Sequence, residues 1–398
     1  MSEPNVLIER ISRSQRTALI VGLVGLAATF AGLAIDKTQF TYSWFYGSLF
    51  WAGISAGALG LLLLNHVAGG NWGAIIRRFL EASSKVMPYT FVPLAIAFFL
   101  PGAMHTLFPW VRPEFMKEPA VAHKIAYLNP RGFTIRFVFY LLFWTFIGYR
   151  LCSRTDIQDK TKDHAEGVAM QVRMRQFSAP MLLLFVLTST FAFFDWVMSL
   201  EPSWYSTIYG AMYLIGQVLA MLALAIILLV RYSDQNPFKE TINMPVTHDL
   251  GNLMLAFTMV WAYLSFSQFL ITWAGNLPEE IQWYQRRFTH GWGYVAWTVA
   301  VFHFCVPFFI LLHRFVKRNP KFLSTLCVYM FLMRLVDVFW LSQPPLRPEL
   351  SVSWMDLTAL AGIGGLWFFL FFGQLKSRPL LPLNDARLIA MRHQHHHA

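Results

Sequence analysis

The chain has 398 residues, of which 56% are hydrophobic and only 13% are charged. A soluble domain averages about 25% charged residues, so this composition excludes an ordinary soluble domain and favours a membrane protein. The net charge of +11 would suit nucleic-acid binding, but the lysines and arginines lie in short connections between apolar blocks, and no nucleic-acid partner is expected.

Apolar blocks recur along the whole chain, each close to the roughly 20 residues that cross a bilayer at 1.5 Å rise per residue. Backbone groups in lipid must be satisfied internally, so the blocks are predicted to be helices. The predicted fold class is therefore all-α and polytopic, with about ten spanning helices that contact the lipid bilayer. We predict spans near residues 17–35, 44–65, 86–108, 132–152, 176–200, 205–230, 249–275, 290–314, 321–342 and 353–375.

A weak internal repeat suggests how these spans are grouped. The fifth span ends with Asp195 seven residues before Pro202, and the ninth ends with Asp337 seven residues before Pro344. Because the copies are four spans apart, they run parallel, as repeats in membrane proteins often do. We interpret residues 1–398 as one membrane domain with two four-helix bundles (44–200 and 205–342), flanking helices (17–35 and 353–375) and a tail (376–398).

Most of the 32 lysines and arginines fall on the side of both termini, and the positive-inside rule predicts that this side is cytoplasmic. No cleavable signal peptide is expected, because charges precede the first apolar run and no small-residue cleavage site follows it. The apolar stripe in Asn71–Lys85 predicts a short helix lying in the cytoplasmic interface. The histidine-rich end of the tail is expected to be unstructured.

Ionisable side chains inside a span are costly and are functional candidates by default. On the outward half, His105, Arg136 and Asp195 come from three consecutive spans. Oxidation of a quinol needs hydrogen-bonding partners and a base for its protons, and these residue types suit that chemistry. The neighbouring Trp196 and Glu201 are candidates for contacting a quinol ring. The alternative is that Arg136 extends to the surface and that Asp195 has a structural role.

A second group of titratable residues suggests a proton path. It comprises His66, His248, Asp249, His303, Arg334 and Asp337. Ordinary interface charges, a packed core histidine at position 303 and a structural Arg334–Asp337 ion pair would give the same pattern.

No metal site is expected, and the three cysteines form no CxxC or CxxCH motif. An iron–sulfur cluster or a c-type haem on this chain is therefore not expected. Haem b is disfavoured because no facing helix carries a second histidine pair that matches His290 and His303 in depth.

Two segments resemble a known family. Phe194–Gly210 (FDWVMSLEPSWYSTIYG) and Ser267–Tyr284 (SQFLITWAGNLPEEIQWY) closely resemble stretches in the membrane subunits of bacterial alternative complex III, which belong to the polysulfide-reductase-like (NrfD-like) family. The resemblance covers essentially the whole chain. Alternative complex III has two such membrane subunits, a longer and a shorter one, and this chain is similar in length to the shorter one.

The resemblance implies a multi-pass subunit of the bacterial inner membrane, without a redox centre of its own, in a quinol:cytochrome c or blue copper protein oxidoreductase of the respiratory chain. The implied ligand is quinol or menaquinol. The implied partners are a sister membrane subunit, an iron–sulfur subunit and c-type cytochrome subunits. The resemblance implies that this chain contributes to quinol interaction, to proton translocation coupled to electron transfer, or to both. The best-supported quinol site of the family lies in the longer sister, which implies that this copy can keep the fold and a proton path without a quinol pocket of its own.

Two other functions remain compatible with the sequence. One is a structural scaffold that anchors the cytochrome and iron–sulfur subunits without a quinol site of its own. The other is a secondary transporter, which ten spans and a weak repeat would permit. The transporter is disfavoured because the spans lack obvious paired helices broken by glycine and proline around a midplane site.

Overall fold

The computed structural model describes residues 3–161, 163–239, 244–382, 384–385 and 387–389. These residues form helices, turns and loops and no strand, which confirms the all-α prediction. Ten of the described helical stretches are long and apolar enough to cross a membrane. The protein is thus a multi-pass, all-α membrane protein.

The spanning helices are α1 (Glu3–Ile35), α2 (Lys37–Ala68), α3 (Asn71–Phe99), α6 (Pro130–Lys160), α7 (His164–Trp196), α8 (Tyr209–Arg231), α9 (Met244–Gly275), the run α11 (Trp292–Thr298), η4 (Val299–Cys305) and α12 (Val306–Leu312), α14 (Pro320–Ser342) and α15 (Trp354–Lys376). The shorter elements are α4 (Ala103–Leu107), η1 (Pro109–Val111), η2 (Phe115–Lys117), α5 (Pro119–Ala122), η3 (Met198–Leu200), α10 (Pro278–Phe288) and α13 (Arg314–Arg318).

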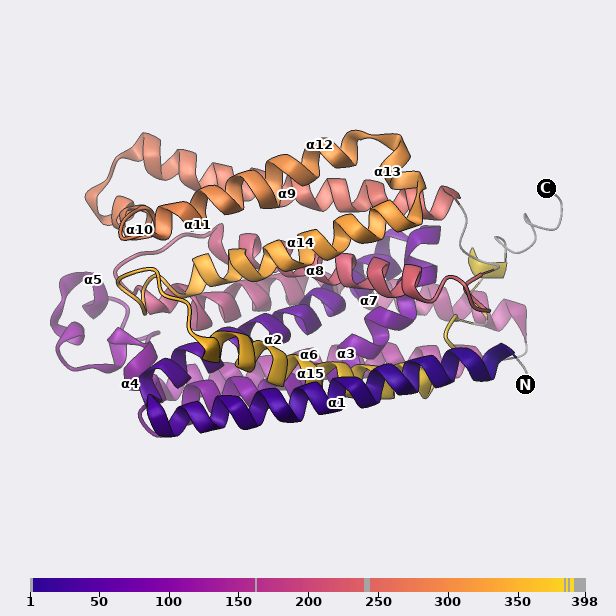
Figure 1. Ribbon diagram of the computed structural model, residues 1–398, viewed down its shortest axis with the longest axis horizontal. Coiled ribbons are helices and arrows are strands. Elements are labelled where there is room, and N and C mark those ends of the chain that lie inside the picture. The colour runs from indigo at the N-terminus through magenta and orange to yellow at the C-terminus, as the bar shows by residue number, and fades with distance from the viewer. Residues whose placement is uncertain (1–2, 162, 240–243, 383, 386, 390–398) are drawn as a thin grey trace.

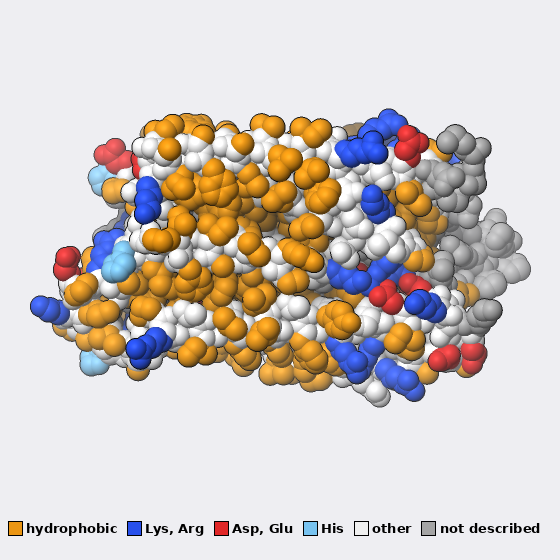
Figure 2. Space-filling view, turned by 90° about the horizontal axis from the view of Figure 1, so that it is seen from below, with side chains coloured by type: hydrophobic (Ala, Val, Ile, Leu, Met, Phe, Trp, Pro, Cys, Tyr) orange, Lys and Arg blue, Asp and Glu red, His pale blue; other side chains and the backbone are white. Residues whose placement is uncertain are grey.

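The long helices run roughly along the longest axis of the molecule, and the start of α1 and the end of α15 lie at the same end of it (Figure 1). We call this end the terminus end. The other end, which carries α4, α5 and α10, is the opposite end. Between the two ends, hydrophobic side chains form a broad belt, and most Lys and Arg side chains gather beyond it (Figure 2). This distribution fits a protein whose middle faces lipid.

Helix α2 lies at the centre of the molecule, because 94% of its most apolar stretch is buried. It packs against α3, α7, α8 and α15. Polar atoms fasten it to its neighbours: the Tyr46 hydroxyl donates to the Leu335 carbonyl of α14 at 2.8 Å, and the Trp51 indole donates to the Leu360 carbonyl of α15 at 2.9 Å. A helix buried on all sides needs such partners, since neither water nor lipid can serve its polar groups.

The first and last spanning helices, α1 and α15, form the most extensive helix pair. Glycines allow their backbones to touch: a Cβ atom added at Gly25 would meet the Gly362 nitrogen at 2.5 Å, and one at Gly22 would meet the Leu366 nitrogen at 2.9 Å. Small residues at such crossings let membrane helices gain van der Waals contact that larger side chains would prevent.

The prediction of a short interfacial helix at Asn71–Lys85 is wrong. These residues form the first half of α3, and the apolar stripe predicted to face lipid headgroups is buried. The helical spacing was recognised correctly, but the stripe packs against protein. Arg77 and Arg78, which flank the stripe in the sequence, are buried as well. The predicted third span (86–108) also ends earlier, because α3 stops at Phe99 and a turn leads into α4.

Replacing Gly25 with leucine is expected to destabilise the fold, because the new side chain cannot enter the α1–α15 crossing without moving a backbone. Overpacking typically costs about 1–3 kcal/mol, so the thermal unfolding midpoint in detergent should fall measurably. Ala27→Leu is the matched control, since Ala27 lies two residues away and is exposed. Equal midpoints for the two variants would contradict the role assigned to this crossing.

Candidate functional site

Asp195 lies in the last turn of α7, near the opposite end of the molecule, and is held by residues of the neighbouring helix α6. Arg136 donates two hydrogen bonds to the Asp195 carboxylate, from Nε and Nη2, both at 2.9 Å. The Tyr140 hydroxyl donates a third at 3.0 Å. Asp195 is 1% exposed, whereas the Arg136 side chain is 21% exposed. The Asp195 carboxylate is therefore buried among the helices, whereas the Arg136 guanidinium that balances its charge is partly exposed.

The connection between α5 and α6 covers this pair. The Arg136 guanidinium lies over the Tyr127 ring, 3.8 Å from its centroid. Burial and the nearby charge of Asp195 raise the pKa of Tyr127, so its hydroxyl stays protonated at neutral pH. Two tyrosines and one arginine thus surround one carboxylate, an arrangement that can hold a charge or pass a proton.

The other candidates near Asp195 are placed differently. Trp196 is buried and packs edge-on against Phe91 and Trp144, so it belongs to a closely packed aromatic core. His105 lies on the short helix α4 and is exposed, and no described contact joins its side chain to Arg136 or Asp195. The structure therefore brings together two of the three predicted outward residues.

Glu201 takes part in a different contact, at the opposite end. It receives hydrogen bonds from Arg286 Nη1 at 3.0 Å and from Arg287 Nη1 at 2.7 Å, both on α10. Arg287 also stacks on Trp283, 3.6 Å from the ring centroid, and donates to the Leu341 carbonyl. These contacts fix α10 across the end of the second half of the molecule.

A second buried carboxylate, Asp337 of α14, lies inside the second half of the molecule. Arg334 pairs with it one turn earlier on the same helix and also donates to the Tyr213 carbonyl of α8 at 3.1 Å. His303 Nε2 lies 3.7 Å from the Asp337 carboxylate, and its ring lies 4.5 Å from that of Trp261 on α9. Arg334, Asp337 and His303 are all buried. Three of the predicted proton-path residues therefore form one cluster.

Local backbone geometry contributes to this cluster, because His303 lies in η4, a π-helical turn within the eighth span. Such turns are rare and occur frequently at functional sites. Among the described residues, neither ring nitrogen of His303 reaches a hydrogen-bond partner. A small rotation of His303 or Asp337 would close the 3.7 Å gap into a hydrogen bond.

The two aspartate clusters occupy corresponding places in the sequence repeat. In each, the carboxylate is paired with an arginine, and a polar side chain from the preceding span, Tyr140 or His303, faces it. The sequence did not identify Tyr140, although it lies one turn from Arg136 on the same helix and this spacing could have revealed it.

The remaining proton-path candidates lie apart from both clusters. His248 and Asp249 are near the start of α9, where His248 lies 3.3 Å from the side chain of Asn252. His66 is buried at the terminus end of α2, beside Asn65. No described contact joins these residues to Asp195 or Asp337.

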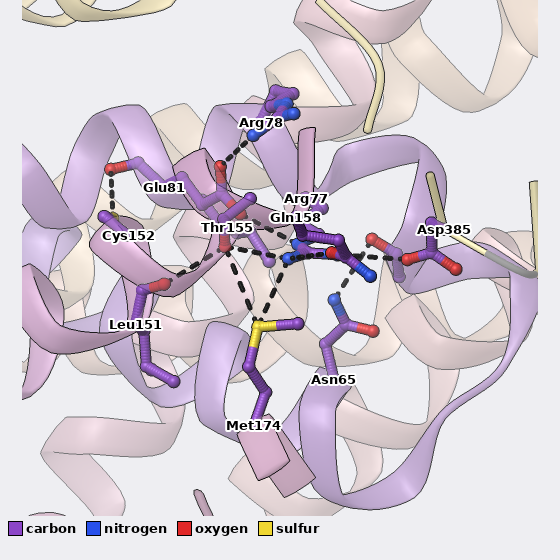
Figure 3. Close-up of polar contacts among 12 residues, drawn as sticks. Asn65, Arg77, Arg78, Glu81, Leu151, Cys152, Thr155, Gln158, Met174 and Asp385 are labelled. Carbon is purple, nitrogen blue, oxygen red and sulfur yellow. Dashed lines mark hydrogen bonds and ion pairs between the residues drawn. The ribbon is translucent and has the colours of Figure 1, made fainter. Parts of the chain in front are cut away.

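An extensive polar cluster that the sequence did not predict lies at the terminus end (Figure 3). At its centre, Arg77 donates to Glu81 at 2.8 Å and to Asp385 at 3.1 Å. It also donates to Thr155 at 2.8 Å and to Gln158 at 3.2 Å on α6. One arginine therefore joins α3, α6 and the C-terminal segment.

The segment after α15 is docked onto this cluster. Arg378 bonds Asp156 at 2.5 Å, Asn384 donates to the Gln158 carbonyl at 2.9 Å, and Arg387 donates to Asn65 at 2.8 Å. The predicted tail (376–398) is therefore structured over its described part, and the terminal histidines lie outside the described residues. Sequence reasoning missed the docking because its partners are distant in the chain.

Two grooves are present on the described surface. One, of about 760 Å³, lies between α1, α15 and the end of α8, and the other, of about 330 Å³, lies between α1, α2, α3 and α15. Neither Asp195 nor Asp337 lines them. Within the described part of the chain, no group of three or more His, Cys, Asp or Glu side chains forms a metal site.

Comparison with known proteins adds no family assignment. No family model matches the chain, and no curated protein matches it.

Replacing Asp385 with alanine is expected to release the C-terminal segment, because it leaves the buried Arg77 without one of its partners. Breaking one side of a buried ion pair typically costs about 3–5 kcal/mol. Residues 377–389 should then become sensitive to limited proteolysis. The control is Asp234→Ala, which removes an exposed partner of Arg10. Unchanged protection in the Asp385 variant would contradict this prediction.

The docking should also depend on pH in a defined way. Burial would raise the pKa of Asp385, but hydrogen bonds from Arg387 and the charge of Arg77 hold this pKa at about 2. Because the folded pKa lies below the ordinary value of about 3.9, the contribution to stability is present above pH ~4 and is lost as the pH falls through about 2. The hydrogen-exchange protection factors of the docked segment, residues 377–389, should thus stay unchanged from pH 8 down to pH 5. If a histidine held the segment in place, its titration would already lower these protection factors within that range.

Proposed function

We propose that this chain is a membrane subunit of a quinol-oxidising respiratory complex of the alternative complex III type, and that it handles the protons released by that reaction. The observation that carries the proposal is the pair of buried aspartate clusters, one in each half of the molecule. Ionisable groups buried within spans are costly and characteristically mark ion or proton pathways. Two such clusters at corresponding positions of a repeat favour a shared chemical role.

The chemistry divides between this chain and its proposed partners. Oxidation of a quinol releases two electrons and two protons. In the proposal, the electrons pass to the iron–sulfur and c-type cytochrome subunits, and this chain carries no redox centre of its own. The protons pass to groups on the membrane subunits. Asp195 is suited to accept or release a proton near the opposite end, since its partner Arg136 is partly exposed.

In the proposal, the cluster of His303, Arg334 and Asp337 holds a proton deeper in the protein. Asp337 and His303 are enclosed and close to contact, and Arg334 supplies the positive charge that offsets an ionised Asp337. A proton could pass from His303 to Asp337 without large movement. The proposal places the terminus end in the cytoplasm of a bacterial cell, supported by the Lys and Arg bias of that end. Quinol or menaquinol is the proposed ligand of the complex.

The packing supports a second candidate function, a scaffold that anchors the electron-carrying subunits without binding quinol. The Asp195 carboxylate is fully engaged by Arg136 and Tyr140. Aromatic side chains fill the space around Trp196. Neither observation requires that this chain itself contact the quinol, and the sister subunit would then supply that site.

Substitution of each aspartate distinguishes these functions. Asp195→Asn and Asp337→Asn remove a titrating group while keeping its shape, in the chain purified with its accompanying subunits and placed in liposomes. We expect electron transfer from quinol to acceptor to fall at least tenfold for Asp195→Asn if it serves a quinol site or its proton exit. We expect Asp337→Asn to lower the number of protons released per electron.

Exposed Asp234→Asn is the matched control, and gel analysis must show unchanged assembly for every variant. Unchanged turnover and unchanged proton release in both buried variants would overturn the proton-handling role and leave the scaffold function.

A further inference from the structure

The groove of about 760 Å³ between α1, α15 and the end of α8 has a polar mouth and an apolar interior. At the mouth, on the terminus end, are Arg10 and Arg13 of α1 and Arg231 at the end of α8. Trp51 of α2 also lines the groove. This division into a charged opening and an apolar channel is the pattern that a molecule with a charged head and an apolar chain would fit.

The charge at the mouth is positive. Arg10 pairs with Asp234 at 2.7 Å and Arg13 pairs with Glu9 at 3.0 Å, so three arginines face two carboxylates. Both of these pairs are exposed, and exposed pairs exchange partners readily because each is worth little. A phosphate group can therefore compete for the guanidinium groups, which bind phosphate through two parallel hydrogen bonds.

The groove also lies at the right depth for a lipid. The arginines lie near the terminus-end tips of α1 and α8, the level at which headgroups meet water. The apolar wall extends along α15 from Leu360 to Phe372, a distance of about 18 Å at 1.5 Å rise per residue. That is more than half of the roughly 30 Å hydrocarbon thickness of a bilayer. An acyl chain that starts at the arginines would thus be covered over most of one leaflet.

We propose that this groove binds an anionic glycerophospholipid, with its phosphate at Arg10, Arg13 and Arg231 and one acyl chain along α15. Ser14, Thr17 and Tyr232 supply further hydroxyl groups at the mouth. A neutral headgroup or an uncharged quinone ring would leave the excess positive charge unanswered, so charge complementarity favours the anionic lipid. The site is separate from both aspartate clusters and does not depend on the proposed function.

The test measures which lipid remains bound to the detergent-purified protein after exchange into equal mixtures of phosphatidylglycerol and phosphatidylcholine. We expect retained phosphatidylglycerol to exceed phosphatidylcholine, and to fall at least fivefold in the double variant Arg13→Gln/Arg231→Gln. Arg16→Gln is the matched control, because Arg16 is an exposed arginine of the same helix and does not line the groove. A second variant, Ala361→Trp, narrows the apolar channel while leaving all three arginines in place.

Loss of phosphatidylglycerol in both the double-arginine and Ala361→Trp variants, with an unchanged unfolding midpoint, supports a lipid held by head and chain. Loss only in the arginine variant, with inorganic phosphate competing equally well, shows a simple anion site and overturns the lipid assignment. Equal retention of the two lipids by the unmodified protein also overturns it.

Discussion

The arrangement of helices depends on how charges are matched inside a largely apolar molecule. A buried arginine or carboxylate that loses its partner costs several kcal/mol, and lipid cannot replace that partner. The pairs seen here therefore restrict which helices can be neighbours. Arg136 and Asp195 require α6 beside α7, Arg334 binds α14 to α8 through a backbone carbonyl, and Arg77 joins α3 to α6. A well-packed apolar pair would stabilise as well, so these ion pairs chiefly specify the arrangement.

Much of the fold could be predicted from the sequence, because span length and hydropathy follow directly from the thickness of the bilayer. The prediction for Asn71–Lys85 failed because this part of α3 is covered by protein and not by lipid. An apolar stripe flanked by Arg77 and Arg78 has the same pattern in either setting, and contacts with distant parts of the chain, on α6 and in the docked C-terminal segment, decide between them. The partners of that segment lie 222 to 322 residues away in the chain, for example 308 residues between Arg77 and Asp385, and no local pattern encodes such a contact.

The candidate site was predicted in part for a related reason. A charged residue within an apolar run is conspicuous in a sequence, so Arg136, Asp195, Arg334 and Asp337 could be identified. Their grouping could not, because depth along a span says little about which face a side chain occupies. His105 was expected in the same outward half as Asp195, yet a turn after α3 leads into the short helix α4, where His105 is exposed. Tyr140 carries no charge and was therefore less conspicuous, and only its spacing of one turn from Arg136 could have revealed it.

The α1–α15 contact has a consequence for how the protein is made. Among the described spans, α1 is made before the others, and its main partner is α15, which is made after them. During synthesis α1 therefore stays in lipid, or on the insertion machinery, without this partner until α15 has been made. A product that ends before α15 thus leaves the glycine surface of α1 without its protein partner.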